Sequence, residues 1–186
     1  MNIIVWGDCS MEFFDVIKKR YTHKERFKAI SIPRSDLEAI ATAGLLAPSG
    51  GNTQSVSLII IDDKNVLDRL CDIASSDGLR SAPAAIAVLI NPDMLMKETD
   101  YSKEDYSAAT ENMLLAATAL GYASVWLDYI LTDRSVQQAY LSVLEAPDNF
   151  LLPVILPVGI PDGEGSKRKK IPINERMSYN VYGKPK

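Results

Sequence analysis

The chain of 186 residues is poor in the residues that build several common kinds of functional site. It has two cysteines, Cys9 and Cys71, and a single histidine, His23. Neither cysteine stands in a C-x-x-C spacing, so we interpret both as reduced thiols. One histidine excludes a metal site with several histidine ligands. It also excludes any Ser-His-Asp triad that does not use His23, which we expect to be an exposed loop residue.

Long apolar runs and an excess of basic charge are also missing. No run reaches the roughly 20 apolar residues that span a bilayer, and the first residues lack the basic start of a signal peptide. We therefore predict a cytoplasmic protein with no membrane partner. The net charge of −4 and the isoelectric point of about 5.1 argue against a nucleic-acid partner, whose binding surface is basic.

Glycine-rich nucleotide motifs are absent too: there is no G-x-G-x-x-G and no G-x-x-x-x-G-K-[ST]. The residues that are present predict one domain over residues 1–186 with alternating helices and strands. Apolar, β-branched runs predict strands over 56–62, 84–90, 124–130 and 151–158. Because Pro153 and Pro157 interrupt the last run, we expect an edge or bulged strand there.

Helices are expected after Ser10 and Ser35, over 64–74 and 102–120, and from Thr132 to Leu144. Ser10 and Thr132 are candidate N-caps, and capping boxes are predicted at Ser35–Glu38 and Ser102–Asp105. Gly121 is the expected residue after the end of the long helix. Pattern alone supports an α+β or α/β layered domain.

Several blocks then appear in a characteristic order, and they are listed here: Arg20-Tyr21-Thr22-His23-Lys24 after a helix; Ala47-Pro48-Ser49-Gly50-Gly51-Asn52-Thr53-Gln54; Ala82-Pro83 before a strand; Gly121-Tyr122-Ala123-Ser124-Val125-Trp126 after a helix; and Pro157-Val158-Gly159-Ile160-Pro161 with Arg168-Lys169-Lys170. Together they resemble the FMN-dependent nitroreductase family, including its R-x-S-x-[RK] and A-P-S-x-x-N-x-Q patterns. Where the family continues with Pro-Trp after the glutamine, this chain has Ser55-Val56.

The resemblance implies an α+β fold with a central, mostly antiparallel sheet surrounded by helices. It implies a homodimer with FMN at the subunit interface, and a tail from about residue 163 that wraps over the surface or the partner subunit. It also implies NADH or NADPH as co-substrate. Hydride would pass to flavin N5 and electrons to a nitroaromatic, quinone or similar small-molecule acceptor by a ping-pong mechanism.

By the same resemblance, Arg20, Lys24, Arg168 and Lys170 would bind the FMN phosphate, because guanidinium and ammonium groups suit a dianion. Thr22 would add a hydroxyl, and Tyr21 would lie along the flavin or cover the core. Against this, the basic positions could be solvated charges, and Thr22 could form an ordinary turn.

Pro48, Ser49, Asn52 and Gln54 would contact flavin from the neighbouring subunit, since amides offer both a donor and an acceptor to the ring. The alternative is a turn that only ends the helix. Asp128 and Tyr129 would bring backbone near N5 and O4, although Asp128 stands where relatives have glycine. Trp126 is interpreted as core.

Other functions stay open from the sequence. The chain could be a flavin-binding carrier or redox sensor with little turnover. It could be an interaction module with a basic tail. It could also catalyse another flavin reaction on the same fold, such as reductive dehalogenation or flavin breakdown.

Overall fold

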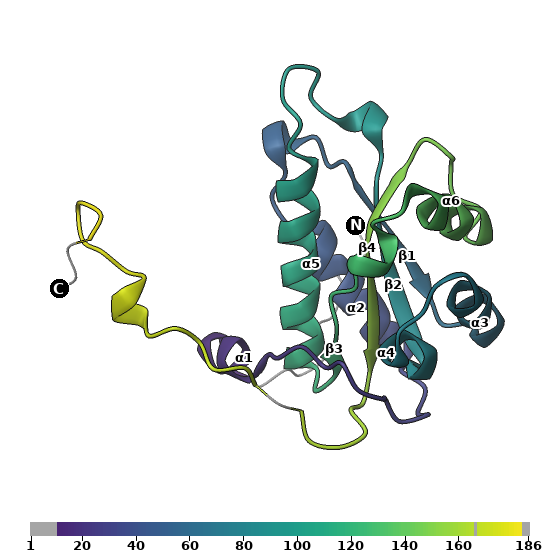
Figure 1. Cartoon of the computed structure of the whole chain (residues 1–186), viewed down its shortest axis with the longest axis horizontal. Helices are drawn as coiled ribbons and strands as arrows, with labels where there is room; N and C mark the ends of the chain where they lie inside the picture. The colour runs from purple at the N-terminus through teal and green to yellow at the C-terminus, as the bar shows by residue number, and fades with distance from the viewer. Residues whose placement is uncertain (1–10, 166, 184–186) are drawn as a thin grey trace.

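A four-stranded antiparallel sheet forms the centre of the computed structural model, which describes residues 11–165 and 167–183. The strand order is β1-β2-β4-β3 (Figure 1). The strands are β1 (Val56–Ile61), β2 (Ala84–Ile90), β3 (Ala123–Ser124) and β4 (Leu151–Gly159). All of their pairings are antiparallel, which confirms the predicted α+β fold.

Helices cover both faces of this sheet. They are listed here with the short 3-10 turns: α1 (Phe13–Lys19), α2 (Arg34–Leu45), α3 (Lys64–Ile73), α4 (Asp77–Ser81), α5 (Ser102–Ala119) and α6 (Arg134–Val143); η1 (Gly50–Asn52), η2 (Pro92–Met94), η3 (Tyr129–Leu131) and η4 (Ile173–Glu175). Figure 1 shows α2 and α5 on one side of the sheet, and α3, α4 and α6 on the other.

The period of two in β2 explains the layers. Ala84, Ile86 and Val88 belong to the core with α2 and α5, and Ala85, Ala87 and Leu89 belong to the core with α3 and α6. All seven residues of β2 are buried, so this strand is apolar on both faces although the sheet is antiparallel.

β4 lies inside the sheet, between β2 and β3, so the bulged strand is the expected alternative that the structure shows. Its prolines are accommodated in two ways. The register with β2 shifts between Val88 and Ile90, opposite Pro153, which is the expected irregularity. Pro157 lies beside the short β3, where its carbonyl accepts from Val125 N at 3.4 Å.

Several predicted helix starts are wrong. The N-cap residue is Pro33 in α2 and Tyr101 in α5. Ser35 and Ser102 therefore lie within their helices and form no capping box. Asp133 caps α6 in place of Thr132, since its Oδ1 accepts from Ser135 N at 2.8 Å. Ser10 and Cys9 lie outside the described residues; α1 has Glu12 at its N-cap position.

The long helix α5 ends as predicted. Gly121 has φ +87°, and Tyr122 N donates to Ala117 O at 2.8 Å. This is the Schellman arrangement, in which a left-handed residue lets the backbone satisfy the last helical carbonyls. The extended segment expected over 124–130 is shorter: strand β3 stops at Ser124, and η3 follows.

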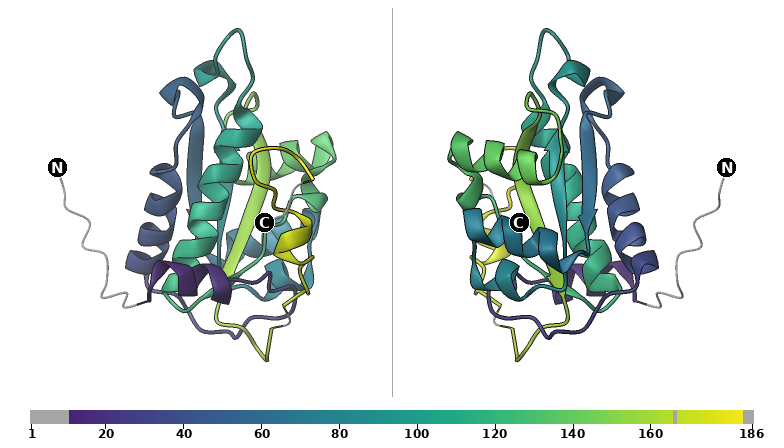
Figure 2. Two further views of the ribbon diagram at one scale, coloured as in Figure 1. Left: turned by 90° about the vertical axis from the view of Figure 1, so that its left-hand side faces the viewer. Right: turned by 90° about the vertical axis from the view of Figure 1, so that its right-hand side faces the viewer.

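The segment after Gly163 is exposed along its described length, as expected for a tail. It passes α1 and then runs away from the body of the sheet (Figures 1 and 2). No helix among residues 11–165 and 167–183 is long and apolar enough to cross a membrane.

Candidate functional site

The first candidate segment, Arg20 to Lys24, runs in extended backbone after α1. Thr22 forms a parallel bridge with Ser124, and His23 N donates to Ser124 O at 3.0 Å. Extended backbone turns alternate side chains to the same side. Thr22 and Lys24 are exposed, whereas His23 is buried. The R-x-S-x-[RK] pattern therefore places three polar side chains on one face.

His23 is 2% exposed, so the expectation of an exposed loop residue is wrong. The alternation turns its ring inward. Its Nε2 lies 2.9 Å from Arg26 O, and its ring centroid is 4.7 Å from that of Phe27. His23 thus anchors the segment from the buried side, and the exposed side is formed by Thr22 and Lys24.

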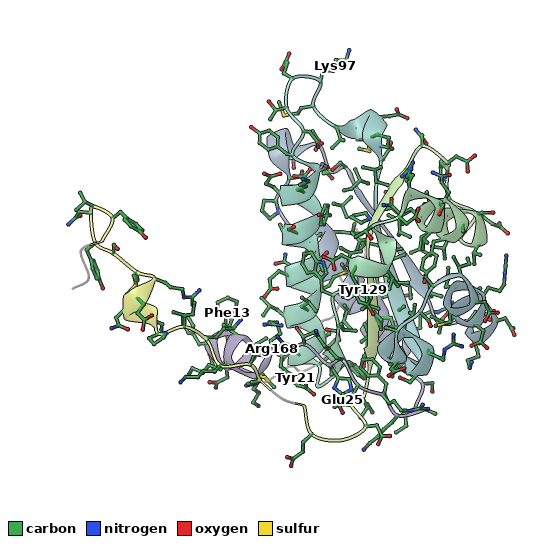
Figure 3. The ribbon with its side chains drawn as sticks, viewed as in Figure 1. Phe13, Tyr21, Glu25, Lys97, Tyr129 and Arg168 are labelled. Atoms are coloured by element: carbon green, nitrogen blue, oxygen red, sulfur yellow. The ribbon has the colours of Figure 1, made fainter. Side chains whose placement is uncertain are left out.

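The basic tail meets this segment despite its distance along the chain. Lys167 Nζ donates to Lys18 O. At Gly165, an added Cβ would lie 1.9 Å from Cε2 of Tyr21, so the tail backbone passes directly against that ring. Figure 3 shows Arg168 near Tyr21 and the end of α1. We call Arg20, Lys24, Arg168 and Lys170 the basic patch.

Arg20 is held toward the body of the protein by α5. Its Nε lies 3.7 Å from Glu111 Oε1, and its side chain is 23% exposed. Lys24, Arg168 and Lys170 are exposed. Guanidinium and ammonium groups suit a phosphate, because the guanidinium gives direction and the lysines add charge.

The second candidate segment, Pro48 to Gln54, follows α2 and contains η1. We call it the 48–54 loop. Ser49 organises it: its Oγ accepts from Gln54 N at 3.0 Å, and its carbonyl accepts from Asn52 N at 2.9 Å. Asn52 and Gln54 have φ values of +57° and +52°. Left-handed backbone at non-glycine residues is costly and persists only where the surroundings enforce it.

Asp105 supplies that enforcement, and sequence reasoning missed its role by assigning it to a capping box. It is 2% exposed and lies in the first turns of α5. Its Oδ1 accepts from Gly50 N at 2.7 Å. Its Oδ2 accepts from Ser55 Oγ at 2.8 Å, and Thr53 Oγ1 lies 3.5 Å away. The unusual Ser55 was the available signal, because a buried hydroxyl needs a partner.

The 48–54 loop and the Arg20–Lys24 segment are attached to different parts of α5, although Arg20 reaches back to Glu111 near the middle of the helix. The loop is fixed to the first turns of α5, whereas Thr22 pairs with Ser124, beyond the other end of that helix. A helix of 18 residues is about 27 Å long. Figure 1 shows η1 and α1 at opposite ends of α5.

Asp128 and Tyr129 lie between β3 and α6. Leu127 bridges to Ile155 of β4, and Leu131 N donates to Asp128 O at 2.9 Å, which closes the η3 turn. Burial and then the charge of Asp128 raise the pKa of Tyr106 on α5. Tyr129 is 59% exposed (Figure 3). Trp126 is half-buried and packs against the core of α2 and α5, in line with its interpretation as core.

No group of three or more possible metal-ligating His, Cys, Asp or Glu residues occurs in the described part of the chain. A shallow hollow of about 270 Å³ lies along β1 and the ends of α3 and α6, and is lined by residues such as Ile60, Arg69 and Glu145. None of the candidate residues lines it. We therefore derive no site from the hollow.

Comparison with known proteins places the chain in a family. The model of the Nitroreductase family matches residues 17–88 and 74–160. The chain is 35% identical over 134 residues to a protein of Archaeoglobus fulgidus named for NADH dehydrogenase or NAD(P)H nitroreductase activity; the match covers 72% of this chain and 76% of that protein. The chain belongs to the nitroreductase family.

Two further relatives extend over nearly the whole chain. An iodotyrosine deiodinase of Thermotoga neapolitana is 29% identical, with 91% of this chain and 98% of that protein covered. The crystal structure of a nitroreductase with bound FMN from Bacteroides fragilis is similar with a TM-score of 0.70 at 28% identity, covering 88% of this chain and 96% of that one.

Proposed function

We propose that the protein is an NAD(P)H-dependent FMN oxidoreductase that works as a homodimer, with each FMN bound between two protomers. The observation that carries the proposal is the contact of the basic tail with the end of α1 through Lys167 and with Tyr21 of the Arg20–Lys24 segment through Gly165. The bound FMN in the similar Bacteroides fragilis structure supports it.

The residues present fit the cofactor's phosphate. That group is a dianion near neutral pH, and the basic patch offers guanidinium and ammonium donors from both ends of the chain. The alternation in the extended segment puts the Thr22 hydroxyl on the same side as Arg20 and Lys24. We assign phosphate binding to these residues, and place Tyr21 under the tail as their support.

The ring system would be held by the 48–54 loop of the partner protomer. The loop is fixed to the first turns of α5, whereas Thr22 pairs with Ser124 beyond the other end of that helix. The loop presents the exposed side chains of Pro48, Asn52 and Gln54. A twofold axis that brings one protomer's loop to the other's basic patch completes the site twice. Backbone near Asp128 and Tyr129 would face the reactive edge of the ring.

Exposed apolar side chains support the dimer. Phe13 is 60% exposed, Phe14 71% and Leu46 70%, all beside α5 and the two candidate segments. Large exposed apolar side chains near a proposed site are candidates for an interface. The exposed apolar residues of the tail, such as Ile173 and Val181, would also pack on the second protomer.

When bound, FMN supplies hydride acceptance at N5 from NADH or NADPH and electron transfer to a second substrate, which gives ping-pong kinetics. The chain's own residues bind the phosphate, orient the ring and leave one face open. No side-chain nucleophile is required. Nitroaromatics and quinones are the proposed acceptors.

A second candidate reaction is reductive dehalogenation of a phenol. The observation in its favour is the likeness to the iodotyrosine deiodinase over 91% of this chain. The same flavin site would serve, with a halogenated phenol as acceptor in place of a nitroaromatic.

The test is an absorption spectrum of the purified protein after FMN addition and desalting, followed by NADH or NADPH under nitrogen. Bound flavin that bleaches and is reoxidised by a quinone, a nitroaromatic or an iodinated phenol supports the enzyme and selects the acceptor. Flavin that is retained but never bleaches would favour the carrier or sensor alternative. A colourless protein would contradict the proposal.

A further inference from the structure

The strongest unexplained feature of the molecule is a buried carboxylate beneath the 48–54 loop. Asp105 is 2% exposed and Ser55 is fully buried. A carboxylate is rarely buried unless its oxygens accept several hydrogen bonds. Here the side-chain oxygens accept from Gly50 N, Thr53 Oγ1 and Ser55 Oγ, which all come from one short segment of the chain.

This segment adopts a backbone that does not persist by itself. Gly51, Asn52 and Gln54 all have φ between +52° and +58°. The donors to Asp105 stand on both sides of these residues, at Gly50 before them and at Ser55 after them. Asp105 therefore closes a polar clamp around the left-handed turn.

The turn also makes apolar contacts. An added Cβ on Gly50 would lie 2.4 Å from Cδ2 of Tyr101, and one on Gly51 would lie 2.8 Å from Sδ of Met96. The loop is thus packed against the start of α5 by the polar contacts of Asp105 and the apolar contacts of Tyr101, with Met96 beside Gly51. Asn52, within this turn, is exposed.

We propose that Asp105 is a positioning residue for flavin binding, and that Ser55 is its dedicated partner in this chain. The proposal rests on the proposed function. The carboxylate fixes the 48–54 loop before cofactor arrives, so that Ser49 and Asn52 meet the partner's flavin without loss of loop entropy on binding. Ser55 stands where the family pattern has proline. A serine hydroxyl can donate a hydrogen bond to Asp105, whereas a proline side chain cannot.

Graded variants test the clamp. Asp105→Ala removes both acceptors. Asp105→Asn keeps an oxygen for Gly50 N, and the Ser55 hydroxyl can rotate to accept from the new amide, so it is the conservative variant. Ser55→Ala removes one donor. Thr110→Val is the matched control, because Thr110 is buried on the same helix and bonds only to Tyr106 O, at 2.6 Å.

Two readouts are measured on the full-length protein: amide hydrogen exchange of residues 49–55 without cofactor, and the dissociation constant for FMN. We expect faster exchange in the loop and roughly tenfold to a hundredfold weaker FMN binding in Asp105→Ala, with smaller changes in Asp105→Asn and Ser55→Ala. Ser55→Ala should add little in the Asp105→Ala background, because both act through one contact. Thr110→Val should lower the melting temperature and leave both readouts unchanged.

The outcomes separate the two proposals. Unchanged loop exchange in Asp105→Ala and Asp105→Asn would overturn the clamp. Faster exchange with an unchanged FMN constant, or an equal loss of affinity in Thr110→Val, would overturn its role in flavin binding. If Asp105→Ala does not fold, the loop exchange and FMN affinity of Asp105→Asn and Ser55→Ala provide the test. A wild-type protein that never holds FMN would overturn the proposed function itself, whatever the exchange rates show about the clamp.

Discussion

Gly50→Ala is a sharp test of how the 48–54 loop is held. The new methyl group would lie 2.4 Å from Cδ2, 2.5 Å from Cγ and 2.6 Å from Cβ of Tyr101. Rotation about χ1 can remove the ring but leaves Cβ in place. Tyr101 is also the N-cap residue of α5, so its backbone cannot yield without disturbing the helix start. The loop itself must therefore move away from Asp105.

The magnitude follows from overpacking. An extra methyl group in a closely packed site costs about 1–3 kcal/mol. For a protein of this size each kcal/mol lowers the melting temperature by about 2–4 °C, so the expected decrease is roughly 2–12 °C. Since the displaced loop would no longer match the flavin, we also expect FMN binding to weaken by at least about tenfold, equivalent to about 1.4 kcal/mol.

Gly121→Ala is the matched control. Gly121 has φ +87°, and an added Cβ there would meet nothing within 4 Å. The substitution strains the backbone by about 1–2 kcal/mol but lies at the far end of α5 from the loop. Melting curves of both variants measure the loss of stability, and FMN fluorescence titrations measure the loss of affinity. If Gly50→Ala binds FMN like the wild type, or if Gly121→Ala loses as much affinity, the reasoning about the loop is refuted.

Further substitutions test the remaining parts of the account. Arg20→Ala should weaken FMN binding by roughly tenfold to a hundredfold, because it loses a charge-assisted phosphate contact, and Arg20→Lys should recover part of this in a fluorescence titration. Phe14→Ser should weaken dimerisation in sedimentation equilibrium by roughly tenfold to a hundredfold while the protomer stays folded; an unchanged constant would remove α1 from the interface. Burial and the hydrogen bond to Asp36 raise the pKa of Tyr122 to about 12, from 10.0. A raised pKa of an acid stabilises the folded state below pH 10 and loses this contribution as pH rises toward 12, so urea unfolding should show a shallower alkaline decline for Tyr122→Phe.

Much of the fold could be predicted from local pattern. Strands β1 and β2, helices α3 and α5 and the Gly121 end agree with the sequence to within about two residues. Helix starts were the weak point. Ser35, Ser102 and Thr132 are all chemically able to cap a helix, yet a neighbouring residue is the N-cap in each case. The direction in which the chain enters a helix is set by tertiary packing and by residues such as Pro33.

The candidate site shows the same division. The alternation in Arg20–Lys24 is a local property, and it explains why the basic and hydroxyl positions share a face. The burial of His23 and the function of Asp105 depend on contacts between segments far apart in the chain. No local pattern reports that Asp105 faces Gly50 and Ser55, since those contacts exist only after α2 packs on α5.

Shared construction of the flavin site can be tested by one measurement: FMN titration of a mixed dimer that carries Arg20→Glu in one protomer and Asn52→Ala in the other. If each site takes its basic patch from one protomer and its loop from the partner, one site in the mixed dimer is wild type and the other carries both substitutions. We then expect one FMN per dimer to bind with wild-type affinity, although neither parent homodimer does so. Weakened binding at both sites would place the whole site within a single chain and contradict the account.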